Sequence, residues 1–297
     1  MNKHISKYLK LHFIIFIWGF TAVLGALIQL DYLSLTWYRM GLAVVFLVMY
    51  IMSKKELSTR LLASDFKSHL RYATGGIIIA LHWLAFFYAI KISNVSITLV
   101  TLSSGAFFTS ILEPLFFKRK IYWYELVLGI LILGGFFILI KVEKIQFAGV
   151  FIALIAAFLS GLFSVINGIY IQNQQGPVLS FFQLFYGFLL LTIILWIKGS
   201  IFQMPLPTQT DWLFLIILAS ICTAYAFTVS ISLMKYLSPF TVMISINLEP
   251  VYGIILAVLF LGKQEEMSPG FYIGAFIILI IIMINAYVKY FNKKAVK

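Results

Sequence analysis

Charged residues and cysteine are both scarce in this chain of 297 residues. Only 11% of the residues are charged, whereas a soluble domain carries about 25%, so a soluble fold is the wrong class. The single cysteine, Cys222, leaves no intrachain disulfide and no thiol pair for redox chemistry. The sequence also contains no Walker loop, no His-Glu-x-x-His motif and no glycine fingerprint for dinucleotides. We therefore expect no cofactor, no metal and no enzymatic activity.

Long apolar runs dominate the sequence instead. Hydrophobic residues make up 62% of the chain, and its mean hydropathy is +1.03. A run of about 20 apolar residues spans the hydrocarbon core as a helix, and these runs lack the two-residue alternation of a barrel strand. The sequence therefore predicts an all-α membrane protein with ten transmembrane helices, at 9–30, 33–52, 69–90, 94–117, 121–140, 147–170, 178–198, 211–234, 239–262 and 269–290.

The net charge of +12 reflects where the basic residues lie between these runs. With the N-terminus inside, 16 of the 22 Lys and Arg residues fall in cytoplasmic segments and five in outer loops. This bias predicts that both termini are cytoplasmic in a multi-pass protein of the bacterial inner membrane. The basic residues form no exposed patch with aromatics, so we expect the lipid bilayer rather than nucleic acid as the partner.

Two halves of the sequence resemble each other at an offset of about 144 residues. Five predicted helices per half is an odd number, so the second half must enter the membrane from the opposite side. We therefore predict two inverted five-helix repeats, at 1–143 and 144–297. The segments that match are Leu35–Arg39 with Leu179–Gln183, Ala89–Lys91 with Leu233–Lys235, and Ser93–Ser96 with Ser238–Thr241.

Short motifs at fixed places along the chain add to this repeat. None is specific by itself, but their order along ten helices is. They are Trp18-Gly19-Phe20, Arg39-Met40-Gly41-Leu42-Ala43, Ala89-Ile90-Lys91, Asn247-Leu248-Glu249-Pro250 and Leu261-Gly262.

Through these motifs the sequence resembles the drug/metabolite transporter superfamily, in its ten-helix EamA-type branch. The resemblance covers nearly the whole chain and implies a secondary transporter, more often an exporter, of amino acids or other small metabolites. Two features depart from the family pattern. Ser104-Gly105 stands where many members have proline, and Gly262-Lys263 replaces a Gly-Glu pair, so no role is carried over from that glutamate.

Arg39 and Glu249 are the sharpest candidates for a substrate site. A charged residue deep in a membrane helix costs about 2.5–3.5 kcal/mol on insertion scales, so it is expected to face a cavity or a partner. Arg39 suits a substrate carboxylate, although it can also cap carbonyls of another helix or snorkel outward. Glu249 suits a substrate amine, a coupling proton or a pair with Arg39, and the alternative is a packing role. Pro250 next to it predicts a hinge.

Other polar residues at membrane depth complete the predicted site. His82 is a candidate for proton coupling beside Glu249, since imidazole titrates near neutral pH. Interhelical hydrogen bonds explain most of the remaining polar residues equally well. Glu113 lies close to Lys118 and is expected at the interface. The predicted substrate-binding set is Trp18, Arg39, His82, Ser104, Gln183, Asn247 and Glu249.

Several functions remain open at this stage. The leading hypothesis is a carrier that alternates access around a midplane cavity for a small organic solute. A passive channel is an alternative, and a sensor subunit or an intramembrane enzyme fits less well because the loops are short and the ionisable groups isolated. Gly270 and Gly274 permit close helix packing, compatible with a monomer or a homodimer.

Overall fold

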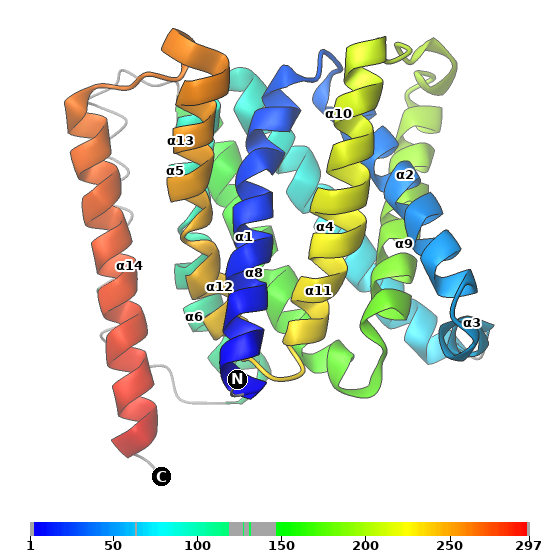
Figure 1. Ribbon diagram of the computed structural model, residues 1–297, viewed down its shortest axis with the longest axis horizontal. Coiled ribbons are helices and arrows are strands. Elements are labelled where there is room, and N and C mark those ends of the chain that lie inside the picture. Colours follow the sequence, from blue (N-terminus) through cyan, green and yellow to red (C-terminus); the bar gives the residue numbers. More distant parts are fainter. Residues whose placement is uncertain (1–2, 63, 119–126, 128–130, 132–146, 296–297) are drawn as a thin grey trace.

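The computed structural model describes residues 3–62, 64–118, 127, 131 and 147–295, which form a bundle of helices (Figure 1). Eight helical segments in this part are long and apolar enough to cross a membrane, and a shorter apolar segment lies at Pro269–Ile281. The expected all-helical membrane fold is therefore confirmed. The predicted helix at 121–140 lies outside the described residues, apart from 127 and 131.

Most spans predicted from the apolar runs agree with the observed helices to within a few residues. Three of them are broken into shorter elements. In chain order the elements are α1 (Lys3–Leu27), α2 (Tyr32–Met52), α3 (Lys55–Leu62), α4 (Phe66–Ile92), α5 (Val95–Leu102), α6 (Gly105–Phe116), α8 (Phe147–Tyr170), η1 (Ile171–Asn173), α9 (Gly176–Ile197), η2 (Ile201–Gln203), α10 (Gln209–Ala219), η3 (Ser220–Tyr225), α11 (Ala226–Leu233), α12 (Pro239–Ile246), α13 (Glu249–Leu261), η4 (Gly262–Gln264) and α14 (Pro269–Ala295).

Polar side chains at the helix starts determine where several of these helices begin. Asp31 accepts hydrogen bonds from the first backbone N–H groups of α2, and Asn94 does the same for α5. Thr208 and Asp211 form a reciprocal capping box at the start of α10. Each cap satisfies N–H groups that have no partner within the helix, which typically contributes about 1 kcal/mol.

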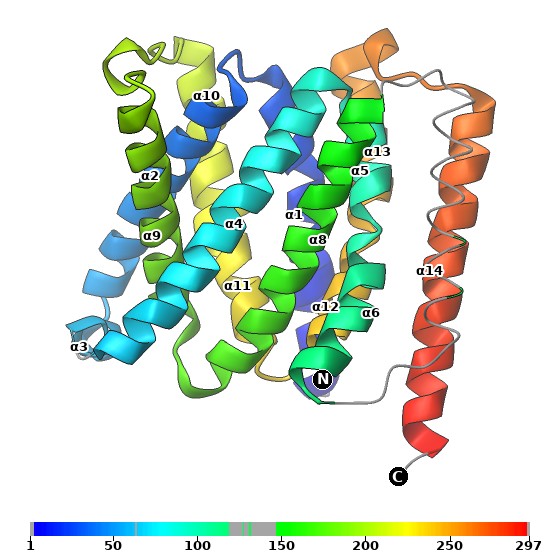
Figure 2. The ribbon, with the colours of Figure 1, turned by 180° about the vertical axis from the view of Figure 1, so that it is seen from behind.

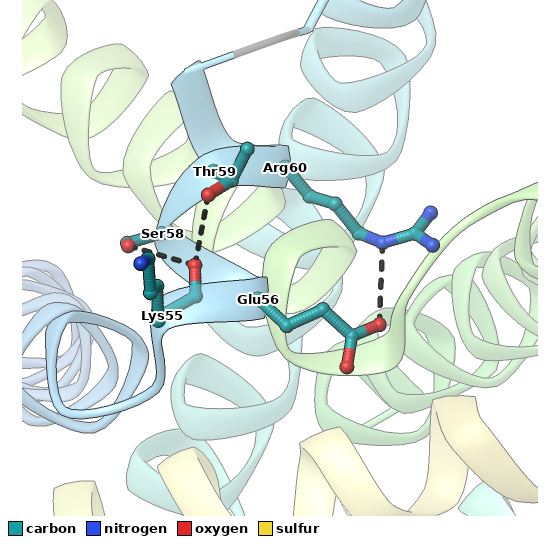
Figure 3. Close-up of polar contacts among 5 residues, drawn as sticks. All are labelled: Lys55, Glu56, Ser58, Thr59 and Arg60. Carbon is teal, nitrogen blue, oxygen red and sulfur yellow. Dashed lines mark hydrogen bonds and ion pairs between the residues drawn. The ribbon is translucent and has the colours of Figure 1, made fainter.

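The charged segment between the second and third apolar runs contains the short helix α3. Its Arg60 and Glu56 lie one turn apart with Nε and Oε1 3.6 Å from each other (Figure 3). Ser58 and Thr59 donate hydrogen bonds to the carbonyl of Lys55. All of these residues except the half-buried Ser58 are exposed, so α3 is a polar helix at one end of the bundle, outside the membrane-spanning set.

The two halves run in opposite senses through the bundle. Helix α1 begins at the end marked N, whereas α8, which opens the second half, begins at the opposite end (Figure 2). Helix α14 ends on the side where α1 begins (Figure 1). This arrangement agrees with the inverted repeat that the sequence predicts.

The halves are joined by close helix crossings. Helix α4 packs along both α8 and α9, and α1 packs along α13. At the α4–α9 crossing, a Cβ atom on Gly76 would collide with the carbonyl oxygen of Gln183, and one on Gly187 would lie 2.8 Å from the carbonyl oxygen of Gly76. The two backbones therefore touch, which only glycine permits at these positions.

Candidate functional site

A cavity of about 90 Å³ lies inside the bundle where helices of both halves meet. This volume is below the roughly 300–1,000 Å³ of sites for drug-sized ligands, so this conformation suits a small solute. Its polar lining residues are Thr21, Arg39, His82, Ser160, Ser164, Ser230 and Glu249, and its aromatic ones are Trp18, Trp83, Phe86, Phe163 and Phe227.

Arg39 on α2 reaches this cavity with part of its guanidinium unused. The side chain is 2% exposed, and its Nε donates a hydrogen bond of 2.7 Å to Thr223 Oγ1. The guanidinium carbon lies 3.8 Å from the centre of the Trp83 ring, a cation–π contact that fixes its plane. Its buried Nη1 has no hydrogen-bond partner among the described residues. The guanidinium of this lining residue therefore keeps an unused donor for an acceptor.

The residue that holds Arg39 belongs to a single π-helical turn, η3, between α10 and α11. In this turn Thr223 Oγ1 donates to the carbonyl of Leu218, five residues earlier, at 2.7 Å. The carbonyl of Cys222 in the same turn accepts a 3.0 Å hydrogen bond from Trp18 Nε1 of α1. Such turns inside α-helices are rare and often mark functional sites. The sequence predicted one continuous helix at 211–234, so η3 was missed.

Glu249 enters the cavity from a break in the ninth predicted helix. Helix α12 ends at Ile246 and α13 begins at Glu249, so Asn247 and Leu248 lie between the two helices. At Asn247 and Leu248 the backbone N–H groups bond three residues back, each at 3.1 Å, instead of four. Pro250 follows within the first turn of α13 and has no N–H to continue the pattern.

A matching break interrupts the fourth predicted helix between α5 and α6. Ser103 ends α5 as Asn247 ends α12, and these residues are 144 positions apart, the offset of the repeat. Here the Ser104 N–H bonds three residues back to Thr101 at 3.1 Å. Both halves thus contribute a discontinuous helix next to the cavity. Substrate sites of inverted-repeat transporters are typically built at such breaks.

Arg39 and Glu249 line the same cavity without pairing to each other. Within the described part of the chain, the one ion pair with N···O within 4.0 Å is Arg60 with Glu56 on α3. Glu249 is 7% exposed, and no described residue donates a hydrogen bond to its carboxylate. The direct Arg39–Glu249 pair that the sequence left open is therefore absent from this arrangement of the described residues.

His82 on α4 also lines the cavity and is 8% exposed. Its Nδ1 donates a 2.8 Å hydrogen bond to the carbonyl of Ala156 on α8. This contact orients the ring and places the proton of the neutral imidazole on Nδ1, so that Nε2 is the nitrogen that can accept a hydrogen bond. The ring also lies beside Phe86, with centroids 6.2 Å apart.

Comparison with known protein families identifies the family to which this chain belongs. The model of the EamA-like transporter family matches the chain twice, at residues 7–141 and 147–287. The chain belongs to the EamA-like transporter family. It is therefore a multi-pass membrane protein of the drug/metabolite transporter type.

No curated protein matches this EamA-like chain. One solved crystal structure of a protein is similar to it over 93% of this chain and 95% of that chain, with a TM-score of 0.66 and 15% sequence identity. At this identity the likeness concerns the fold alone.

Three members of the predicted binding set lie away from the lining of the cavity in this EamA-like protein. Gln183 Nε2 donates to Asn167 Oδ1 at 2.8 Å, in a contact between α9 and α8. The hydroxyl of Ser104 donates to the carbonyl of Thr101 at 2.7 Å. Asn247 ends α12, and its buried Nδ2 has no partner among the described residues. The lining residues from the predicted set are Trp18, Arg39, His82 and Glu249.

Glu113 was expected at the interface, and its position relative to the membrane stays a prediction, but the structure adds a contact that the sequence did not predict. The residue is 2% exposed, and its Oε2 accepts a 3.0 Å hydrogen bond from the N–H of Phe240 at the start of α12. The sequence places Glu113 near Lys118, but it gives no sign that a helix of the other half begins against this carboxylate. Burial is compensated because the carboxylate receives a hydrogen bond there.

Glu265 is a further residue that the sequence analysis missed. It follows the Gly262-Lys263 pair that departs from the family pattern. Its carboxylate accepts hydrogen bonds from the N–H groups of Val95 and Ser96, at 2.9 and 3.0 Å, at the start of α5. Each half therefore sends one glutamate to the first turn of the broken helix in the other half.

The Trp18-Gly19 motif also has a structural reason in this family member. A Cβ atom on Gly19 would lie 2.8 Å from the Cβ atom of Tyr252 on α13, so glycine lets α1 approach the helix that carries Glu249. Thr223 and the hydroxyls of Thr21, Ser160, Ser164 and Ser230 were not predicted, since serine and threonine occur on many apolar helices without contacting a cavity.

Proposed function

We propose that this EamA-like protein is a secondary transporter of small zwitterionic metabolites, with amino acids as the leading class. The observation that carries the proposal is a fixed cation and an acid on the wall of one small cavity, unpaired with each other. A substrate carboxylate accepts hydrogen bonds from Arg39, whose Nη1 is otherwise buried without a partner. The substrate ammonium then pairs with Glu249, so that the solute completes the charge balance of the site.

Aromatic rings are proposed to contact the remainder of the solute. Trp83 stacks on Arg39, and Trp18 is anchored by its indole N–H to the carbonyl of Cys222. These contacts hold both rings in place before a solute arrives, which lowers the ordering cost of binding. The neighbouring Phe86 and Phe227 give the cavity an apolar wall that suits an uncharged side chain.

Transport is proposed to proceed by alternating access around this cavity. The two helix breaks, with Pro250 as the hinge of the ninth helix, supply segments that can tilt on either side of the site. Polar contacts join the elements at both ends of the bundle. Lys91 Nζ donates to the carbonyl of Ile28 at 2.7 Å at one end, and Glu113 accepts from Phe240 at the other. Opening of one end requires rupture of its own contacts while those at the far end persist.

Export through the inner membrane, with both termini cytoplasmic, is the direction we propose. The orientation is supported by the excess of Lys and Arg in the segments on the side of the termini. Proton coupling is assigned to Glu249, with His82 as its partner, because both groups line the cavity. Binding of the substrate amine at Glu249 and protonation of Glu249 then exclude each other, which couples the two fluxes.

The experiment is a flux assay in proteoliposomes loaded with a mixed metabolite extract, whose efflux is followed by mass spectrometry. Wild type is compared with Arg39→Gln and with Arg60→Gln, a matched control on the exposed helix α3. Zwitterionic solutes should leave from wild-type and Arg60→Gln vesicles and be retained by Arg39→Gln vesicles and by empty liposomes.

Three outcomes contradict parts of this proposal. Flux that rises linearly with concentration, without saturation, indicates a channel. Saturable flux of solutes without a carboxylate shows that Arg39 has another role. Efflux equal to that of empty liposomes, with and without an imposed pH gradient, overturns the transport of these metabolites.

A further inference from the structure

A second and larger cavity lies on the side of the bundle, near the end where α1 begins. It has a volume of about 1130 Å³ and is formed by α1, α2, the start of α9, η3 and α11. Figure 1 shows α11 between α1 and α2 at this end. We call this cavity the lateral groove. Its lining residues are Ser6, Lys7, Lys10, Phe46, Leu47, Tyr50, Pro177, Ser220, Ala224, Tyr225, Thr228, Val229, Ser232, Leu233 and Tyr236.

The charge of the lateral groove has one sign and is confined to one end. Lys7 and Lys10 are three residues apart on α1 and therefore share a face of the helix. Lys7 Nζ lies 3.5 Å from the centre of the Tyr236 ring, which holds the ammonium at the mouth of the groove. Among the described residues that line the groove, none is acidic. The ammonium groups thus lack a carboxylate partner there.

The remaining walls of the groove are mostly apolar. Phe46, Leu47 and Tyr50 line it from α2, and Val229 and Leu233 from α11. Cations at the end of the bundle followed by apolar walls towards its middle reproduce the polarity of a membrane leaflet. The basic end is the one proposed to face the cytoplasm, where anionic lipids attract Lys and Arg.

We propose that the lateral groove binds an anionic phospholipid, with its phosphate at Lys7 and Lys10 and an acyl chain along α2 and α11. The surrounding bilayer supplies such a ligand at high local concentration. The volume of the lateral groove exceeds the roughly 300–1,000 Å³ of small-solute sites. A lipid headgroup together with part of an acyl chain requires such a larger space. A soluble anion would use the lysines but leave the apolar walls exposed.

The lipid would touch the segment that supports Arg39. Thr223 holds Arg39, and its neighbours Ala224 and Tyr225 line the lateral groove. On α11, Ser230 lines the central cavity while Val229 lines the groove. An acyl chain packed on this face favours one position of η3 and α11. Modulation of transport by the lipid follows, and this consequence, like the cytoplasmic orientation of the basic end, rests on the proposed function.

The test measures lipid binding to the full-length, delipidated protein in detergent by native mass spectrometry. Phosphatidylglycerol is titrated against phosphatidylcholine with the same chains, and glycerol phosphate serves as a soluble headgroup. Phosphatidylglycerol should bind about tenfold more tightly than phosphatidylcholine, given two lysines near the phosphate. The variant with Lys7→Gln and Lys10→Gln should lose this preference. The control variant with Lys54→Gln and Lys55→Gln should keep it, because these exposed lysines lie at the start of α3, a helix at the same end of the bundle (Figure 1).

A second variant tests the apolar part of the lateral groove. Val229→Trp fills the space for the chain and should weaken both phospholipids while glycerol phosphate is unaffected. Equal affinity for the two lipids, full preference in the Lys7 and Lys10 variant, or competition by glycerol phosphate at the concentration of the lipid would each overturn the proposal. Because binding is read without transport, a failed carrier function leaves this result interpretable.

Discussion

Arg39 and Gln183 occupy matching positions of the two repeats, 144 residues apart, yet their surroundings differ. Both side chains are buried. Arg39 lines the central cavity with an unpartnered Nη1. Gln183 has an unpartnered Oε1 as well but does not line this cavity. Its Nε2 donates to Asn167, and its amide packs against Gly75 of α4, where a Cβ atom would collide with it. The same backbone frame therefore supports a cavity residue in one half and a packing residue in the other.

The backbone breaks of the two halves, by contrast, are alike. Ser103 and Asn247 each end the first segment of a broken helix at corresponding places. The backbones of the two repeats are similar, so each places a discontinuous helix beside the cavity. The side chains that the two repeats carry at the cavity are different. The cation comes from the first half and the acid, Glu249, from the second. Under the proposed function, this asymmetry favours a solute with two different ends over a symmetric one.

Arg39→Gln makes the first half resemble the second and is expected to have the largest effect. Transport of zwitterions should fall about 100-fold, because a hydrogen bond to a charged group contributes about 1.5–3 kcal/mol. The melting temperature in detergent should stay the same or rise, since a buried cation is removed. Initial efflux rates and a thermal melt measure the two effects. Wild-type efflux in a folded variant would contradict the assigned role.

Glu249→Gln removes the charge of the second half and should have the next largest effect. Efflux of zwitterions should fall about 30-fold, consistent with the loss of a charge-assisted contact to the ammonium. Organic acids without an amine should move at least as well as in wild type, because Arg39 remains. Dependence of the flux on a pH gradient should also disappear. Glu56→Gln on α3, with its exposed side chain, is the matched control.

The sequence predicts the helices that surround this site better than the contacts between its side chains. Apolar runs give the spans because a helix must cross the hydrocarbon core, and buried charge marks Arg39 and Glu249. The π-helical turn η3 leaves no such pattern, so the support of Arg39 by Thr223 was missed. The contact of Glu113 with Phe240 was missed as well, because this partner comes from the other half and proximity in sequence to Lys118 says nothing about it.

Thr223→Val tests whether η3 positions Arg39, with a smaller expected effect. The loss of one hydrogen bond to the guanidinium should raise KM about tenfold, while kcat changes little because Arg39 keeps its charge. Thr223→Ser retains the hydroxyl and should restore KM. Concentration dependence of efflux separates the two constants. If the serine and valine variants behave alike, the hydroxyl does not position Arg39.

Gln183→Leu probes the packing side of the comparison and should have the smallest effect on transport. The substitution leaves Asn167 buried with its Oδ1 deprived of the Gln183 donor, which costs about 1–3 kcal/mol of stability. The melting temperature should fall, while the efflux rate per folded molecule stays at the wild-type value. Gln183→Glu keeps the shape and exchanges the donor for an acceptor, so it should lower the melting temperature at least as much. A loss of transport without a loss of stability would instead make Gln183 a second contact for the solute, and the asymmetry between the two repeats would then no longer explain the site.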